Sequence, residues 1–517
     1  MSFFQRYWTT RQGRQAGGSQ TSDSACIDSS MYGNLNQLET IFSGIPDLTM
    51  RELPLKTGEK ALLVYLDGLI NKTIVNRDIV HPLLVAETVY PEQMESVLFV
   101  GKIKQINLWA EIEESLFHGC CIIFMDGFPQ AFLIEAQGWP QRAIQEPQIE
   151  SAIKSAHQGF IETANANISM IRRYIPSREL KIKEHTIGER GGAKVSLLYL
   201  ADVTNPQILD ELEKRLESIT VDIILNTGEL EGYLEDRAFT PFPQFSMTER
   251  PDTAASHILQ GRVVIVMDRS PGVLVAPMTF FSYFQTVDDY SVRWFAASFI
   301  RLLRFVAFFI AILAPAIYIA TVSFHYELIP LPLLLTIGES RERVPLPPIL
   351  EAFIMEMVLE MLREAGLRLP APIGQTIGIV GGIVIGQAAV SAGLVSNIMV
   401  IVVALTAIAS FIIPNLEMSA GVRMIRFPMM VAASLFGMVG IIWGLMLVIL
   451  HLLSLESLGT PYGASFSPFH FSELKDTFVR LPVWMMKKRP IELKPKQIDR
   501  QGDDDGGNGG HHDEKIE

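Results

Sequence analysis

The C-terminal half of this sequence contains apolar stretches long enough to cross a membrane, and they constrain the fold more than any other feature. A membrane-spanning helix needs about 20 mainly apolar residues. Residues 297–322 meet this length, and spans are also expected at 373–392, 397–414 and 428–453. We therefore expect an all-α polytopic membrane domain of about four spans over residues 291–455.

Residues 325–370, between the first two spans, do not have the pattern of a span. “LIPLPLLLTIGESRERVPLPP” is short and broken by prolines, and “ILEAFIMEMVLEMLREAGLRL” is an amphipathic helix. A re-entrant or interfacial placement is expected for this segment. Glu356, Glu360 and Glu364 recur at four-residue spacing and share one helix face. The sequence leaves two readings open: a solvated face, or a vestibule that attracts cations when several subunits assemble.

The stretch 372–393 predicts a helix with two different faces. Small residues gather on one side, as on the small-xxx-small packing faces of membrane helices. The packing candidates are Gly374, Gly378, Gly382 and Gly386. The opposite side alternates polar and apolar residues, as expected of polar mouths around an apolar constriction in a pore. The pore or gate candidates are Thr376, Val380, Ile383, Val384, Gln387 and Ser391. The alternative is a structural helix whose Gln387 bonds to a neighbouring helix.

The N-terminal half contains short β-branched runs that end in an aspartate and a turn. They come in two pairs, over 61–137 and 195–277, so we expect a duplicated α/β unit. The strand-end position is shared by Asp67, Asp126, Asp202 and Asp268. In an enzyme these side chains would supply paired carboxylates or metal ligands, but a turn aspartate bonded to nearby backbone is commoner. No catalytic or nucleotide-binding motif accompanies them, so neither enzymatic activity nor a metal or other cofactor is expected.

Charge and cysteine content limit the partners and the compartment. The formal net charge is −13, which speaks against nucleic-acid binding. Cys120 and Cys121 are neighbours and, with Cys26, do not make a disulfide framework, so buried reduced thiols in a cytosolic domain are expected. The N-terminus has no stretch apolar enough for a signal peptide, so the N-terminal half is expected on the cytoplasmic side. Three arginines at the start of the first span agree with this orientation, and we expect them to snorkel to the cytoplasmic membrane surface: Arg293, Arg301 and Arg304.

These features divide the chain into six segments. The two ends are polar and glycine-rich, and we expect them to be disordered. The expected boundaries are 1–35 for the disordered N-terminus, 36–150 and 151–290 for two α/β subdomains, 291–455 for the membrane domain, 456–490 for a cytoplasmic segment and 491–517 for a disordered tail. The fold class is thus an α/β cytoplasmic N-terminal region, built from a duplicated unit, followed by an all-α polytopic membrane domain.

Several long motifs resemble one known family. “LREAGLRLPAPIGQTIGIVGGIVIGQAAVSAGLVSNIMVIVVALTAIASFIIP” is followed by “RFPMM” and “GTPYGASFSPF”, and the soluble half contains “ANISMIRRYI” and “TERPDTAASHILQGRVVIVMDRSPGVLVAP”. Over residues 50–490 these motifs closely resemble the A subunit of the spore germinant receptors of endospore-forming Firmicutes, the GerA family. The stretch “KSAHQGF” departs from the family's pattern.

The resemblance implies a multi-pass protein of the spore inner membrane with its N-terminal domain on the cytoplasmic, or core, side. It implies a homo-oligomer, with a pentamer as one stoichiometry, that assembles with a transporter-like B subunit and a lipoprotein C subunit. Such an oligomer would form a nutrient-gated channel for monovalent cations that triggers germination. Two alternatives stay open: a non-conducting membrane scaffold subunit of the receptor, and a membrane-bound enzyme that uses the strand-end aspartates.

Overall fold

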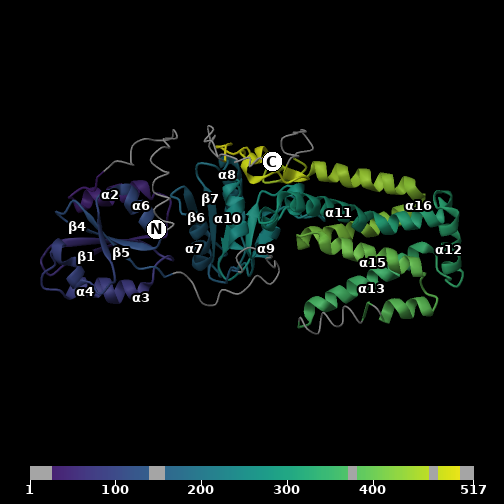
Figure 1. Ribbon diagram of the computed structural model, residues 1–517, viewed down its shortest axis with the longest axis horizontal. Helices are drawn as coiled ribbons and strands as arrows, with labels where there is room; N and C mark the ends of the chain where they lie inside the picture. Colours follow the sequence, from purple (N-terminus) through teal and green to yellow (C-terminus); the bar gives the residue numbers. More distant parts are fainter. Residues whose placement is uncertain (1–25, 139–157, 371–380, 383, 465–475, 501–517) are drawn as a thin grey trace, which may run out of the picture.

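The computed structural model describes residues 26–138, 158–370, 381–382, 384–464 and 476–500. In Figure 1, two α/β units lie at one end of an elongated molecule and long helices lie at the other. The second unit lies between the first unit and the helices. Two five-stranded sheets, each packed between helices, confirm the α/β fold class expected for the N-terminal half. We call the units the first repeat (residues 26–138) and the second repeat (residues 158–290).

The first repeat is an antiparallel sheet with strand order β1-β2-β4-β5-β3. Successive residues of β2 enter opposite cores, with Leu62 on one face and Leu63 on the other. Such a strand is buried on both faces, which explains its unbroken apolar run. Helices α2 and α6 cover one face, and the segment from α3 to α5 covers the other. The elements are α2 (Met31–Ile41), β1 (Leu48–Pro54), β2 (Lys60–Leu66), α3 (Lys72–Ile74), η1 (Val75–Val80), α4 (His81–Val85), η2 (Pro91–Gln93), α5 (Met94–Val97), β3 (Ile103–Ile106), α6 (Trp109–Phe117), β4 (Cys120–Met125) and β5 (Ala131–Glu135).

The second repeat has the equivalent antiparallel order, β6-β7-β9-β10-β8. Helices α7 and α10 cover one face of this sheet, and α8 and α9 cover the other. The two sheets therefore have one topology, as expected of a duplicated unit. The elements are α7 (Ala164–Tyr174), β6 (Leu180–Ile187), β7 (Ala193–Leu200), α8 (Pro206–Ser218), α9 (Thr227–Leu234), β8 (Ser246–Thr248), α10 (Pro251–Leu259), β9 (Val263–Met267), β10 (Val273–Ala276), η3 (Phe280–Phe284) and η4 (Val287–Tyr290).

The aspartates after β4 and β9 hold equivalent helix ends. Asp126 accepts a hydrogen bond of 3.1 Å from the backbone N–H of Met31, at the start of α2. Asp268 accepts one of 3.2 Å from the N–H of Ala164, at the start of α7. A carboxylate at a helix N-terminus satisfies a backbone donor and favours the helix dipole. The repeated aspartates thus have a structural role, and each bonds within its own repeat.

Further pairs of bonds repeat in the same way. Asn34 in α2 and Asn167 in α7 each bind both backbone groups of the residue six positions before them. The turn after Asp126 uses Gly127, with φ of 83°, and the turn after Asp268 uses Arg269, with φ of 69°. A positive φ suits glycine and is unusual for arginine. The second repeat therefore keeps the backbone conformation of this turn without the residue that favours it.

The other two strand-end aspartates have no common partner. Asp67 forms an ion pair of 2.8 Å with Lys72, and Asp202 is exposed. The neighbouring thiols are buried as expected: burial, followed by the charge of Glu135, raises the pKa of Cys120 to about 11, and burial raises that of Cys121 to about 12. Across the described ranges, no group of three or more His, Cys, Asp or Glu side chains is placed to hold a metal ion.

The helical part begins immediately after the second repeat. Its helices are α11 (Trp294–Ser323), α12 (Leu331–Arg341), α13 (Pro348–Arg368), α15 (Asn397–Ile412) and α16 (Leu416–Ser454), with the short η5 (Tyr326–Leu328) after α11. By length and composition, α11 and α16 are candidates to cross a membrane, and α15 is a shorter apolar helix. Of the expected span 373–392, residues 381–382 and 384–391 are helical, and 373–380 and 383 lie outside the described residues.

Helix α16 differs from the single span expected at 428–453. Gly437 has φ of 60° and ψ of −139° and divides α16 into two arms. A Cβ added at Gly440 would overlap the carbonyl oxygen of Ala432, and one at Gly444 would lie 2.5 Å from Sδ of Met429. Residues on either side of Gly437 are therefore in contact, and the arms are antiparallel. The expectation of one uninterrupted helix was wrong because this glycine looks like one more packing residue in an apolar run.

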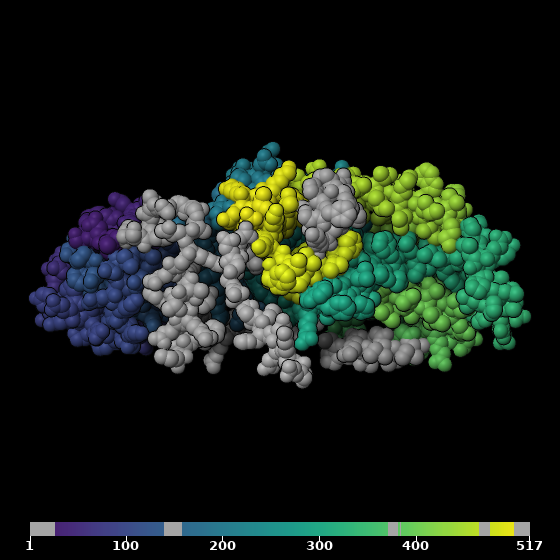
Figure 2. Space-filling model, turned by 45° about the horizontal axis from the view of Figure 1, so that its top comes forward, coloured from purple at the N-terminus to yellow at the C-terminus, as the bar shows by residue number. Residues whose placement is uncertain are grey.

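The second repeat and the helical part share one hydrophobic core. This core contains residues from α7 and α10 together with residues from α11, α15 and α16. Both ends of α16 return to the second repeat: Pro241 closely approaches Gly421, and Thr240 bonds to His451 at 2.8 Å. Figure 2 shows the C-terminal residues, in yellow, lying over the same region. They include β11 (Glu456–Ser457), β12 (Thr460–Pro461), η6 (Val483–Met485) and η7 (Ile491–Leu493).

Candidate functional site

A proline in α11 creates a polar site inside the helical part. Pro315 has no backbone N–H, so the carbonyl of Ala311, four residues earlier, has no helical donor. Arg426 of α16 supplies one instead: its Nε donates a hydrogen bond of 2.7 Å to the Ala311 oxygen. Between apolar helices an unpaired carbonyl is costly. The arginine therefore compensates for the proline and joins α16 to α11.

The same arginine forms an ion pair with α13. Nη1 of Arg426 donates to Oε2 of Glu356, and each residue is only 3% exposed. Removing one partner of a buried pair costs about 3–5 kcal/mol, because the other charge stays buried without compensation. Charged groups this deep between apolar helices are rare and are commonly functional. Pro315, Arg426 and Glu356 thus connect three helices at one point.

The other carboxylates of the α13 stripe have different surroundings. Glu360 pairs with Arg423 of α16 at 3.2 Å, and Glu364 pairs with Arg368 of its own helix at 2.6 Å. The Glu364 side chain is 59% exposed, whereas Glu356 is buried. The structure therefore divides the predicted stripe into two carboxylates that face arginines of α16 and one that faces outward. A vestibule formed by several subunits stays a prediction for Glu356, Glu360 and Glu364.

A second buried carboxylate lies one turn earlier in α13. Glu351 pairs with Arg341 of α12 at 3.0 Å and accepts a hydrogen bond of 3.0 Å from the backbone N–H of Ser396, just before α15. The sequence reading did not identify Glu351, Arg341, Pro315 or Arg426 as functional residues. A signal was present, because Arg423 and Arg426 are three residues apart in an apolar run and Glu356 and Glu360 are four apart in another. Opposite charges with matching helical spacing are expected to pair.

The pore-candidate residues that the structure describes differ in their exposure. Val384 is 57% exposed, and Gln387 and Ser391 are exposed as well. On the other face Gly386 is buried, with Val400 of α15 at 3.8 Å from an added Cβ. Gly382 has open space around it, and the tight contact is at Gly381, where an added Cβ would lie 2.9 Å from Leu362. The remaining candidates lie outside the described residues: Gly374, Gly378, Thr376, Val380 and Ile383.

The arginines at the start of α11 are not spread at a membrane surface as expected. Arg301 is fully buried and pairs with Asp289 at 3.0 Å and with Asp476 at 2.8 Å, and Arg304 pairs with Asp289 at 2.8 Å. Burial opposes ionisation of Asp289, but the hydrogen bond and charge of Arg304, together with Arg301, outweigh it and hold its pKa below the ordinary value. Snorkelling was the wrong expectation for these two residues because carboxylates of η4 and the C-terminal segment meet them.

The sequence matches known proteins along most of its length. The family model described as “Bacillus/Clostridium GerA spore germination protein” matches residues 36–492. Spore germination protein KA of Bacillus subtilis (strain 168) is 39% identical over 487 residues, which cover 92% of this chain and 89% of that protein. The uncharacterized membrane protein YfkQ of the same organism is 37% identical over 468 residues, which cover 90% and 91% of the two chains.

One solved structure is also similar, with a TM-score of 0.39 and 24% identity. It is the crystal structure of the N-terminal domain of the A subunit of the Bacillus megaterium spore germinant receptor GerK3, and the match covers 50% of this chain and 98% of that one. The family match extends through both repeats and the helical part. The chain therefore belongs to the GerA family of spore germination proteins.

Proposed function

We propose that this GerA-family protein is the A subunit of a nutrient germinant receptor in the spore inner membrane. In this proposal several copies, a pentamer being one arrangement, form a channel for monovalent cations whose opening triggers germination. A transporter-like B subunit would bind the nutrient, and a lipoprotein C subunit would complete the receptor. The family match supports the role in germination, and the relatives named as spore germination proteins agree with it.

The observation that carries the channel proposal is the exposure of the bulky face of residues 384–391. Val384, Gln387 and Ser391 point away from the rest of the chain, whereas Gly386 packs against α15. An apolar side chain between polar ones suits a constriction that closes by losing its water. We assign the constriction to Val380, Ile383 and Val384, between Thr376 at one polar mouth and Gln387 and Ser391 at the other. Glu364 is the exposed carboxylate of the α13 stripe and is the one best placed to attract cations.

The two ends of the helical part support one common side for the repeats and the C-terminal segment. α11 leaves the second repeat, and the last arm of α16 returns to it, where Arg237 bonds to Ser454 at 3.2 Å. Both repeats and the segment after Ser454 would then lie on the cytoplasmic side. α11, the two arms of α16 and the shorter apolar α15 would cross the bilayer, together with the less apolar α13 and the helix that contains Val384. This proposal replaces the four spans and the re-entrant or interfacial segment 325–370 expected from the sequence.

The test is cation flux through the assembled receptor in liposomes. Val384→Ser should lower the barrier to wetting and raise the leak of monovalent cations in the absence of nutrient. Val439→Ser is the matched control, because Val439 is 55% exposed and lies on α16, away from the proposed pore. If Val384→Ser and substitutions of Gln387 leave flux unchanged in fully assembled receptor, the subunit is a non-conducting scaffold.

The enzyme alternative has less support. Asp126 and Asp268 hold helix ends in separate repeats, Asp67 pairs with a lysine, and Asp202 is exposed. The four carboxylates therefore do not form a common site in the described structure.

A further inference from the structure

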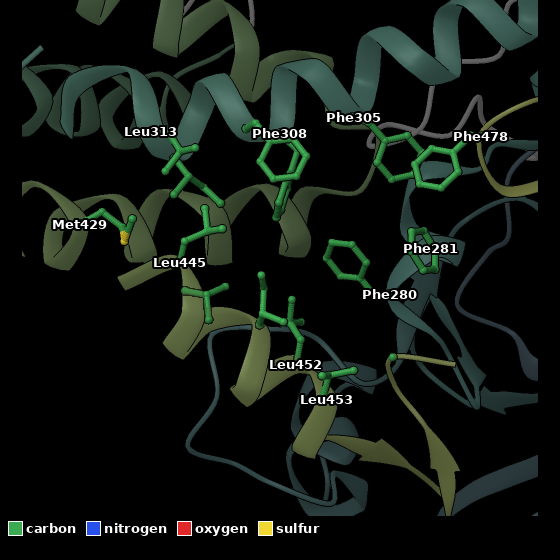
Figure 3. A pocket seen from close by; sticks show the side chains of 15 residues that line it. Phe280, Phe281, Phe305, Phe308, Leu313, Met429, Leu445, Leu452, Leu453 and Phe478 are labelled. Atoms are coloured by element: carbon green, nitrogen blue, oxygen red, sulfur yellow. The ribbon is translucent and has the colours of Figure 1, made fainter. Parts of the chain in front are cut away.

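An apolar cavity of about 520 Å³ lies where α11, the second arm of α16 and the second repeat meet. Figure 3 shows Phe308 and Leu313 of α11 facing the same space as Leu445 and Leu452 of α16, with Phe280 at one side. The volume falls within the range of roughly 300–1,000 Å³ that is usual for ligand sites. Among the residues that the structure describes, none that lines the cavity has a polar or charged side chain.

The depth of the cavity can be inferred from the arginines of α11. Arg301 and Arg304 pair with carboxylates of the soluble side, so the hydrocarbon begins close to Arg304. The α11 residues that line the cavity extend from Phe305 to Leu313, a distance of about 12 Å along the helix. One leaflet contributes about 15 Å of hydrocarbon, half of the total thickness of about 30 Å. The cavity therefore lies at the depth of the cytoplasmic leaflet.

The opening of the cavity lies between two helices that are long and apolar enough to cross a membrane. Three of its lining residues are also half exposed on the outside of the molecule: Phe309 at 49%, Ile449 at 47% and Leu453 at 46%. The medium in contact with the opening is then hydrocarbon. An apolar cavity does not favour water, and a void would lose dispersion contacts around its whole lining.

We propose that this cavity binds an acyl chain of a phospholipid from the cytoplasmic leaflet. The lining is apolar and the opening faces hydrocarbon, so a lipid chain of the leaflet reaches the cavity without crossing water. A single methylene chain can follow the space between α11 and α16. The part of the chain nearest the headgroup would contact Phe280, Phe281 and Phe478, which belong to the second repeat and the C-terminal segment, and its end would lie near Leu313 and Leu445. The lipid would thus stabilise the packing of the soluble half against the membrane helices, whether or not this subunit conducts ions.

The test uses the full chain in nanodiscs of phosphatidylglycerol in which the acyl chain carries a diazirine near its end. After irradiation, labelled residues are mapped by mass spectrometry. Leu445 lines the cavity and is half-buried, whereas Leu447, on the same arm, is 61% exposed to the outside. A bound acyl chain labels Leu445 and Phe308 more strongly than Leu447. Labelling in proportion to exposure, with Leu447 strongest, would show bulk lipid contact only and overturn the proposal.

Variants that fill the cavity give the second part of the test. Leu445→Trp and, separately, Val448→Phe should abolish the label at Phe308, while Leu447→Trp should leave it unchanged. Two substitutions are used because either one alone can impair folding, which the retention of α-helical circular dichroism checks. A diazirine-bearing free fatty acid, added and then removed with albumin, distinguishes the source of the chain. The albumin wash comes before irradiation. If the fatty acid labels the cavity only when the wash is omitted, and the phospholipid does not label it at all, a leaflet lipid is not the occupant.

Discussion

The two repeats share strand order and helix-capping bonds, but only the second repeat has a hydrophobic core that extends into the helical part. Both cores of the first repeat consist of residues between Ile27 and Ala136. In the second repeat the core under α8 and α9 is also nearly self-contained. The core under α7 and α10 continues into α11, α15 and α16, through the phenylalanines of η3. The first repeat therefore has hydrophobic cores of its own, whereas the second repeat shares one core with helices α11, α15 and α16.

The first repeat is attached to the second by a smaller set of polar contacts. Asp47 pairs with Arg172 of α7 at 2.8 Å, and Lys181 donates to the carbonyl oxygen of Ser43. A Cβ added at Gly68 would overlap the hydroxyl of Ser169, so the two surfaces approach closely there. The second repeat is thus joined to the helices through a hydrophobic core, whereas these polar contacts and close approaches join the first repeat to the second.

The largest expected effect comes from breaking the joint between the second repeat and α11. Asp289→Ala removes the carboxylate shared by Arg301 and Arg304, both of which stay buried. The loss of one partner from a buried ion pair costs about 3–5 kcal/mol. We expect a lower unfolding temperature and faster proteolytic separation of the soluble half from the helices. Thermal unfolding in detergent and limited proteolysis measure these two changes.

The matched control for this prediction is Asp47→Ala, at the joint between the repeats. Arg172 is fully buried, but the Asp47 side chain is 23% exposed, so water can replace part of the lost bond. We expect a cost of about 1–3 kcal/mol and cleavage between the repeats only. If Asp47→Ala lowers the unfolding temperature as much as Asp289→Ala, the first repeat is as firmly integrated as the second and the comparison fails.

The duplication was predictable from the sequence because its signals are local. A β-branched run, an aspartate and a turn fall within a few residues, and Asp126 and Asp268 occupy equivalent positions in the structure. The helices that these aspartates hold are far away in sequence, at Met31 and Ala164, so the capping partners could not be read from spacing. The turn conformation at Arg269 was also hidden, because arginine is not a residue that indicates positive φ.

The helical part was less predictable because its decisive contacts are between distant residues. Composition identified apolar helices, but not that Gly437 turns α16 back on itself. Glu356 looked like part of an exposed acidic stripe because its partner, Arg426, is 70 residues away. Arg426 also donates a hydrogen bond to the Ala311 carbonyl, which has no helical donor because residue 315 is a proline. A periodicity argument shows which residues share a face, but not which face meets another charged helix.

A second prediction concerns a carboxylate where the second repeat meets α16. Burial, followed by the charges of Glu417 and Glu235, raises the pKa of Glu231 from its ordinary 4.5 to about 9. Between these two pH values the folded chain holds a proton that the unfolded chain releases, so stability falls as pH rises from 4.5 to about 9. From pH 7 to pH 9 the loss is about 2 kcal/mol.

Glu231→Gln should remove this dependence, because a glutamine stays neutral at every pH. The unfolding temperature of the variant should exceed that of the parent increasingly from pH 7 to pH 9, as measured by differential scanning fluorimetry. Glu217→Gln, at an exposed position of α8, is the control and should leave the pH profile unchanged. An unchanged profile in Glu231→Gln would contradict the prediction, because it would mean that Glu231 ionises normally in the folded chain.

The smallest effect is expected where the repeats are most alike. Asp126→Ala and Asp268→Ala each remove a helix-capping bond, at a cost of about 1 kcal/mol. The Asn variants keep an acceptor and lose only the interaction of the charge with the helix dipole, about 0.3–1 kcal/mol. Because the cap is local, the two alanine variants should shift the unfolding temperature by similar amounts and leave spore germination intact.

A loss of germination in Asp126→Asn or Asp268→Asn with stability and receptor assembly unchanged would favour a chemical role for these carboxylates. If only Asp268→Ala lowers the unfolding temperature, this cap supports the core that the second repeat shares with the helices.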